Sequence, residues 1–122
     1  MDDAERRRQM AAGRDCFNRG EFYEAHEAWE EVWLVVDDPD WTWIQGLIQI
    51  ATGFHKLNDG RRESAERSLR RGLERAEDAP AWLDGVDVDG ARRAARAVLA
   101  SLDRGERPRA APNLLSTDAP DR

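Results

Sequence analysis

Apolar residues along the chain recur every three to four positions, and the strict alternation typical of a strand is nearly absent. This periodicity predicts an all-α protein. Glycine or proline interrupts the pattern between segments, as at Gly20, at Gly60 and in the turn at residues 37–40. The predicted helices cover residues 4–18, 22–36, 41–58, 62–77 and 89–103.

The length of 122 residues is enough for one domain with a hydrophobic core. We expect residues 1–105 to form this domain as about five helices in antiparallel hairpins, with a loop at residues 80–85. Residues 106–122 contain three prolines and are expected to be an irregular tail, with Leu114 and Leu115 docked on the core.

A short pattern occurs twice, 40 residues apart, in which a glycine is followed five residues later by an alanine (Gly20 and Ala25, then Gly60 and Ala65). The arrangement is similar to the turn of a tetratricopeptide repeat, whose period is shorter, at about 34 residues. The chain is therefore expected to form two helical hairpins stacked in that manner, without being a true repeat protein.

The segment 41–58 is apolar around most of its circumference and should be the central, buried helix. Gly46 and Gly53 lie seven residues apart on one face, where the absence of a side chain would let a neighbouring helix approach closely. Its narrow polar stripe consists of Gln45, Gln49, Thr52 and Lys56.

The segment with the clearest chemical content is the one from His26 to Trp33. At about 100° per residue, Glu30 lies roughly 40° and Trp33 roughly 20° from His26 around a helix axis, so the three share one face. Phe22 and Tyr23 are among the aromatic residues beside them. A titratable pair with aromatic neighbours can hold a metal, move a proton, or form a satisfied core pair.

Folding the second predicted helix against the third would place more polar groups beside this pair, namely Gln45, Gln49 and His55. Three interpretations are open. His26 and Glu30 could bind a divalent metal, with His55, Gln49 or water completing the shell. Glu30 could orient His26 for general acid–base catalysis on a small ligand. The pair could also be structural. The pattern is not that of a zinc protease, because Glu30 stands where the second histidine would be.

Composition narrows the classes of partner. The net charge of −6 and the pI of about 5.0 argue against a nucleic-acid partner. No segment resembles a membrane span or a signal peptide, and the single Cys16 cannot form an intramolecular disulfide, so we expect a cytoplasmic protein. Only one of the 19 basic residues is a lysine, Lys56, which suggests a salt-adapted source.

Two segments together resemble the small helical proteins of domain-of-unknown-function family 309, over about Cys16 to Leu73. The family hallmark, His-x-x-x-Glu-x-x-Trp/Tyr, is matched by His26, Glu30 and Trp33. The resemblance implies an all-helical fold and singles out these three positions, for which metal binding has been suggested; it implies no activity. The matching segments are Gly20-x-Phe22-x-x-Ala25-His26-Glu27-x-Trp29-Glu30-x-x-Trp33 and Gln45-Gly46-Leu47-Ile48-Gln49-x-Ala51, with Lys56 after them.

The leading hypothesis is a divalent-metal or small-ligand site between the second and third helices. His26 and Glu30 would be metal ligands in it, and Trp33 would be a wall. Gln45, Gln49 and His55 would be supporting groups. The competing hypothesis is a metal-free interaction module that binds a peptide or a second copy of the chain, with His26 and Glu30 as a structural pair. The sequence does not decide whether the protein is an enzyme.

Overall fold

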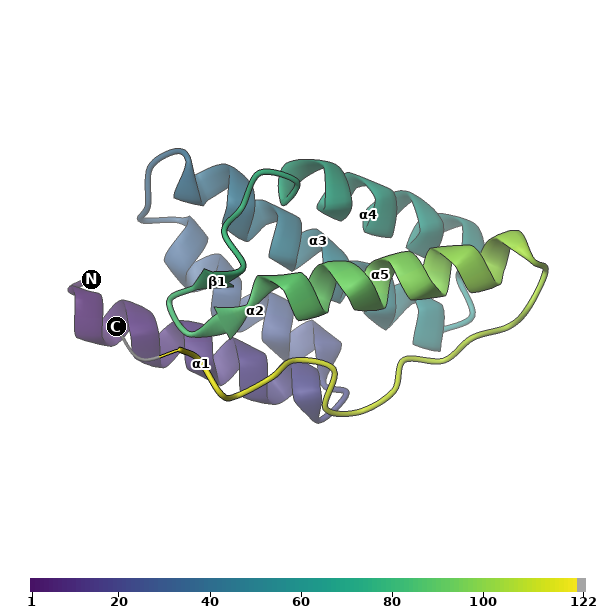
Figure 1. Ribbon diagram of the computed structural model, residues 1–122, viewed down its shortest axis with the longest axis horizontal. Helices are drawn as coiled ribbons and strands as arrows, with labels where there is room; N and C mark the ends of the chain where they lie inside the picture. The colour runs from purple at the N-terminus through teal and green to yellow at the C-terminus, as the bar shows by residue number, and fades with distance from the viewer. Residues whose placement is uncertain (121–122) are drawn as a thin grey trace.

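The computed structural model describes residues 1–120, which form five α-helices and one two-stranded hairpin (Figure 1). The helices are α1 (Asp3–Asn18), α2 (Phe22–Trp33), α3 (Asp40–Asn58), α4 (Arg62–Arg75) and α5 (Val88–Asp103), and the strands are β1 (Trp82–Leu83) and β2 (Val86–Asp87). The predicted all-α fold is confirmed. Within residues 1–120, no helix combines the length and apolar character that a membrane crossing requires.

The two predicted hairpins are α1–α2 and α3–α4, and their turns match. Gly20 and Gly60 have φ angles of +79° and +77°, which a residue with a side chain rarely adopts. In each turn the amide that follows the glycine donates, over 2.9 Å, to the carbonyl five residues before it. This bond satisfies a free carbonyl at the end of the first helix. The repeated glycine therefore marks two similar helix ends.

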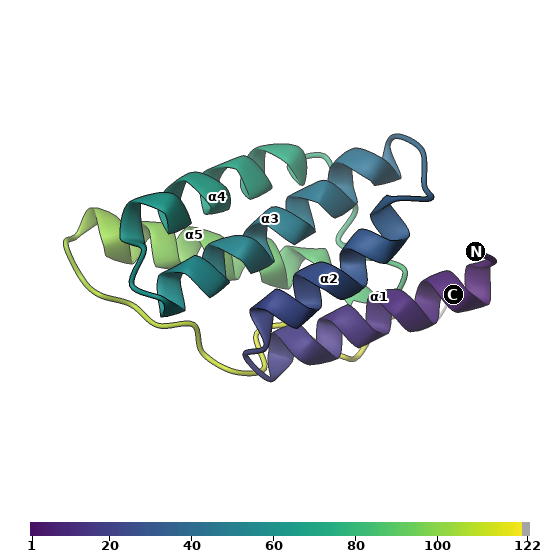
Figure 2. The same cartoon turned by 180° about the vertical axis from the view of Figure 1, so that it is seen from behind.

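The helices α1, α2, α3 and α4 pack in chain order, each against the next. In Figure 2, α2, α3 and α4 lie side by side across the near face, with α1 beside α2. The last helix, α5, covers the opposite side, against α3 and α4 (Figure 1). The polar residues of the central helix are only partly buried and can reach solvent; these are Gln45, Gln49, Thr52 and Lys56.

The central helix α3 approaches α4 closely at its glycines, as predicted. A Cβ atom at Gly46 would lie 2.8 Å from the carbonyl oxygen of Gly72, and one at Gly53 would lie 2.7 Å from the side chain of Leu69. Distances this short are not tolerated between real atoms. The two helices can therefore cross at this separation only because these positions lack side chains.

An aromatic cluster joins the two hairpins in the core. The Phe17 ring lies 4.9 Å from Phe22, 5.5 Å from Phe54 and 5.7 Å from Trp29, measured between centroids. Trp29 is fully buried, and its indole Nε1 donates to the carbonyl of Met10 over 3.1 Å. Its polar atom is therefore satisfied, and Trp29 is a core residue, not a wall of a site.

The second helix ends at Trp33, three residues earlier than predicted. Its last turn tightens: the amide of Val35 donates to the carbonyl of Val32, a bond to the third residue back instead of the fourth. Residues 34–36 lie outside the helix, ahead of the turn that contains Pro39. The ring of Pro39 disfavours a helical conformation at Asp38, the residue before it.

The segment predicted as a loop at residues 80–85 instead carries a short β-hairpin, in which Trp82 faces Asp87 and Leu83 faces Val86. Asp84 and Gly85 form its turn with φ angles of +50° and +84°. Positive φ at both central residues is the signature of a type I′ turn, for which Asp-Gly is a favoured pair. The strands are too short for an alternating pattern to be visible in the sequence.

The tail that follows α5 has no regular structure over residues 106–120 and returns along the molecule to α1 (Figure 1). Leu115 is buried against the core, and Leu114 packs partly against it. The buried side chain of Asn18 binds both backbone groups of Leu115: its Nδ2 donates to the carbonyl over 3.0 Å, and its Oδ1 accepts from the amide over 2.9 Å. Asn18 therefore fixes the tail to the end of α1.

Candidate functional site

The three residues of the motif lie on one face of α2 and are called the α2 stripe below: His26, Glu30 and Trp33. The Nε2 atom of His26 lies 3.4 Å from Oε2 of Glu30. The His26 side chain is 23% exposed and that of Glu30 47% exposed, so the pair stands at the surface, within reach of a ligand. The predicted pairing of these side chains is therefore observed.

The contact made by the other ring nitrogen of His26 indicates which of the two nitrogens carries the proton in the neutral imidazole. Nδ1 lies 2.9 Å from the carbonyl oxygen of Tyr23. A carbonyl oxygen can only accept a hydrogen bond, so we assign the proton to Nδ1. In the neutral ring, Nε2 then presents its lone pair toward the Glu30 carboxylate. Nε2 of His26 and Oε2 of Glu30 are then two electron-rich atoms that face each other. A proton or a cation between them relieves the repulsion between these two atoms.

Tyr23 connects the two histidines of the chain. Its ring centroid lies 5.1 Å from that of His26 and 5.5 Å from that of His55, and the residue is 49% exposed. His55 and His26 thus share Tyr23 as an aromatic neighbour, and a place for His55 in the site remains a prediction. The Nε2 atom of His55 lies 3.6 Å from Oδ2 of Asp59, so His55 is half of a second histidine–carboxylate pair, at the C-terminal end of α3.

The two glutamines predicted as supporting groups belong to the half-buried face of α3. Gln49 is held by α4: its Oε1 accepts a hydrogen bond from Nη1 of Arg75 over 2.8 Å. This contact on the α4 side of the helix was not predicted from the sequence. A role for Gln45 or Gln49 in a site remains a prediction.

Trp33 closes the stripe at the end of α2. Its ring stacks on that of Trp41 from α3, with centroids 4.8 Å apart and planes inclined by 29°. Its indole Nε1 is buried and, among residues 1–120, has no hydrogen-bond partner. A buried donor without an acceptor is uncommon in folded proteins and is often satisfied by a bound water or ligand. Trp41, Leu34 and Val35 are exposed at this end of the molecule.

His26 and Glu30 are too few to complete the ligand shell of a metal by themselves. Within residues 1–120, no three side chains of histidine, cysteine, aspartate or glutamate are grouped closely enough to hold an ion. Zinc sites use three or four protein ligands, whereas His26 and Glu30 are two. The pair therefore fits a divalent cation only with water or another molecule providing the remaining donor atoms.

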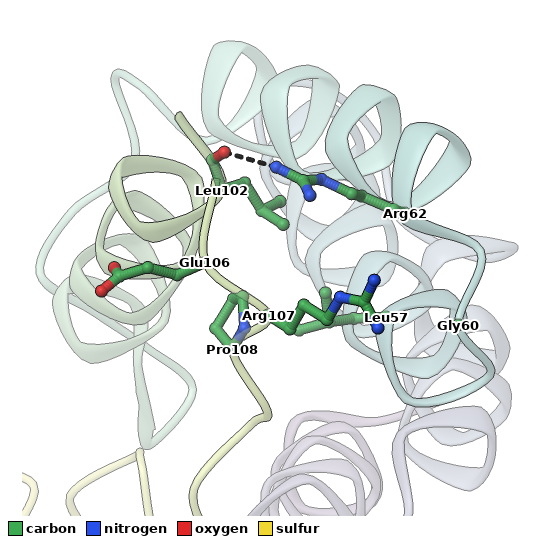
Figure 3. Close-up of a pocket in the computed structure, with 7 residues that line it drawn as sticks. All are labelled: Leu57, Gly60, Arg62, Leu102, Glu106, Arg107 and Pro108. Carbon is green, nitrogen blue, oxygen red and sulfur yellow. Dashed lines mark hydrogen bonds between the residues drawn. The ribbon is translucent and has the colours of Figure 1, made fainter. Parts of the chain in front are cut away.

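A cavity of about 380 Å³ lies elsewhere, at the C-terminal end of α3, against the end of α5 and the tail (Figure 3). Nη2 of Arg62 donates to the carbonyl of Leu102 over 2.6 Å across it. The cavity shares no residue with the α2 stripe. Its lining consists of Leu57, Gly60, Arg62, Leu102, Glu106, Arg107 and Pro108.

Sequence reasoning missed two features of the site. It treated Tyr23 only as a neighbour of the stripe, although its position three residues before His26 places the two on adjacent turns of one helix face. It also did not connect Trp41 with Trp33. A contact between the ends of two helices depends on the intervening turn, and no local pattern in the sequence reveals it.

The fold and the paired side chains define a class: small all-α proteins of stacked helical hairpins, with a histidine–glutamate pair on the second helix. Residues 10–68 match the family described as Domain of unknown function (DUF309). The predicted resemblance to this family is confirmed over those residues.

One curated relative is an "Uncharacterized protein" of Aquifex aeolicus (strain VF5), 28% identical over 104 residues. The match covers 84% of this chain but 31% of the relative. The chain thus spans about a third of the length of the curated relative that it matches, and the domain occurs there within a longer polypeptide.

Proposed function

We propose that this domain binds a divalent cation at the α2 stripe, with His26 Nε2 and Glu30 Oε2 as the protein ligands. The convergence of these two atoms at 3.4 Å carries the proposal, because Nδ1 of His26 is already committed to the carbonyl of Tyr23. Imidazole and carboxylate together suit zinc, manganese or iron. The bond from Nδ1 to a carbonyl is also the kind of outer contact that orients a metal-binding histidine.

The site is of the open kind, since two protein ligands leave several coordination positions free. Those positions would be filled by water or by donor atoms of a small molecule. The unpartnered indole N–H of Trp33 supports a bound molecule nearby, because it needs an acceptor that the described residues do not provide. The proposed function is therefore binding of a cation together with a small ligand, and no reaction is assigned.

The test is metal analysis of protein purified without an affinity tag, followed by titration with Zn²⁺ and Mn²⁺. We expect saturable binding that is lost in both His26→Ala and Glu30→Ala. Asp59→Ala is the matched control, because it removes a carboxylate that pairs with a histidine four residues earlier, and it should bind as the parent does.

Two results would count against the proposal. If Asp59→Ala weakens binding as much as Glu30→Ala, the cation is held by surface carboxylates in general. If no cation binds and the two stripe variants are only less stable, the pair is structural. The second result would favour a metal-free interaction module, for which the exposed Leu34, Val35 and Trp41 offer an apolar surface.

A further inference from the structure

A cluster of positive side chains lies on α3, α4 and the turn between them, apart from the α2 stripe. It is called the basic cluster here and consists of Lys56, which binds Ser68 of α4, of Arg67 and Arg71, which lie one helical turn apart on α4 on either side of Ser68 in the sequence, and of Arg61 in the turn. Lys56 is the only lysine of the chain and belongs to the polar stripe of α3. Its Nζ donates to Oγ of Ser68 over 3.0 Å, which fixes the ammonium group against α4.

The environment of Lys56 is unfavourable for its charge. Burial lowers the pKa of its ammonium group below the ordinary value. Three like charges lower this pKa further, those of Arg61, Arg67 and Arg71. No carboxylate contributes to the shift. Among residues 1–120, Lys56 has no carboxylate oxygen within 4.0 Å, and its partner at the boundary between α3 and α4 is the neutral hydroxyl of Ser68.

The arginines of the cluster are also poorly compensated. In the described part of the chain, neither Arg67 nor Arg71 has a carboxylate oxygen within 4.0 Å, and both are exposed. Arg61 has a long contact of 3.5 Å with Asp59. On the same helix, Arg70 differs: it pairs with Glu66 over 2.9 Å and with Asp103 over 3.4 Å. Arg70 is therefore paired, whereas Arg67 and Arg71 on the same helix are not.

Such a cluster is unexpected in a protein with a net charge of −6. Of its four cations, only Arg61 has a carboxylate oxygen within 4.0 Å among residues 1–120, so their mutual repulsion is largely uncompensated and a bound anion would stabilise them. Guanidinium forks and an ammonium group beside a hydroxyl match the several oxygens and the double charge of a phosphate better than they match a carboxylate.

We infer that the basic cluster binds a phosphate group, either free or as the monoester of a small molecule. Lys56 and Ser68 would form the base of this site, and Arg67 and Arg71 its exposed edge. The inference goes beyond the proposed function and stands without it, because it shares no residue with the α2 stripe. If both hold, one domain has a cation site and an anion site on neighbouring helices.

The experiment is a titration of ¹⁵N-labelled protein, followed by NMR, with inorganic phosphate, with glycerol 3-phosphate and with acetate at constant ionic strength. We expect saturable shifts for both phosphates at the amides of Lys56 and Ser68 and at Nε of Arg67 and Arg71. Tighter binding of glycerol 3-phosphate than of inorganic phosphate would assign the site to a phosphorylated molecule. Equal binding of the two would assign it to free phosphate. Acetate should produce only weak, unsaturated changes.

Arg67→Gln/Arg71→Gln should raise the phosphate dissociation constant at least about tenfold, because it removes two charge-assisted donors. Arg70→Gln is the matched control on the same helix and should leave the constant unchanged. Lys56→Met keeps the apolar stem, and we expect it to lose binding without loss of thermal stability. Phosphate should also raise the pKa of Lys56 in the parent protein.

Any of three results would overturn the inference: shifts that do not saturate, acetate binding as well as phosphate, or Arg70→Gln weakening binding as much as the double variant. Failure here leaves the cation site untouched, since zinc titration of the same samples reports on His26 separately.

Discussion

Gly72 is one of the residues on which the close packing of α3 against α4 depends. A Cβ atom there would lie 2.7 Å from Cγ1 of Ile50 and 2.8 Å from the carbonyl oxygen of Gly46. The second contact is with backbone, which cannot move without separating α3 from α4. Two glycines that face each other across a crossing therefore set the distance between the helices that carry the basic cluster.

Gly72→Ala should lower the free energy of unfolding by about 1–3 kcal/mol, because overpacking forces the helices apart. The measurement is chemical denaturation, with Arg71→Ala as the control, since it places the same alanine at an exposed neighbouring position. Equal stability of the two variants would mean that α4 shifts freely and that the crossing is not fixed by the glycines.

At this scale, the sequence predicts pairs within one helix better than contacts between helices. His26 and Glu30 meet because four residues are about one helical turn, which needs no tertiary information. The hydrogen bond from Arg75 to Gln49 joins α4 to α3, and it was not predicted. Such a contact depends on how α3 is rotated between its neighbours, which helical periodicity in one sequence does not set.

At the scale of elements, helix ends were predicted well where glycine marks them and less well elsewhere. Gly20 and Gly60 end α1 and α3 through their positive φ angles. The end of α2 at Trp33 has no such marker, since Leu34 and Val35 continue the apolar pattern. The hairpin between α4 and α5 was missed, although its Asp84–Gly85 turn is a recognisable signal.

The tail is held by Asn18, and this attachment can be tested. Asn18→Ala removes the two hydrogen bonds to the backbone of Leu115 and should lower the free energy of unfolding by about 1–3 kcal/mol. Hydrogen exchange should show loss of protection at the Leu115 amide while the amides of α3 and α4 keep theirs.

A suitable control for the tail is Asn58→Ala, an exposed asparagine at the corresponding end of α3. It should leave exchange at Leu115 unchanged. If Asn18→Ala also leaves it unchanged, the burial of the Leu115 side chain alone holds the tail, and the hydrogen bonds contribute little.

At the scale of the whole molecule, the two proposed sites, one for a cation and one for an anion, lie on neighbouring helices of one stack. The α2 stripe offers a nitrogen and a carboxylate oxygen, and the basic cluster offers cations. The aromatic core and the two glycine turns fix the helices that carry them. The same domain in the longer relative from Aquifex aeolicus implies that this stack can be joined to further sequence.

The central claim is that His26 binds a cation through Nε2 while Nδ1 donates to the carbonyl of Tyr23. The most direct measurement is the ¹⁵N spectrum of the imidazole side chains during titration with Zn²⁺. We predict that Nε2 of His26 shifts and saturates on binding, that Nδ1 keeps its proton, and that Glu30→Ala abolishes the change. A His26 ring protonated at both nitrogens and unaffected by zinc would contradict the account and identify the pair as a structural ion pair.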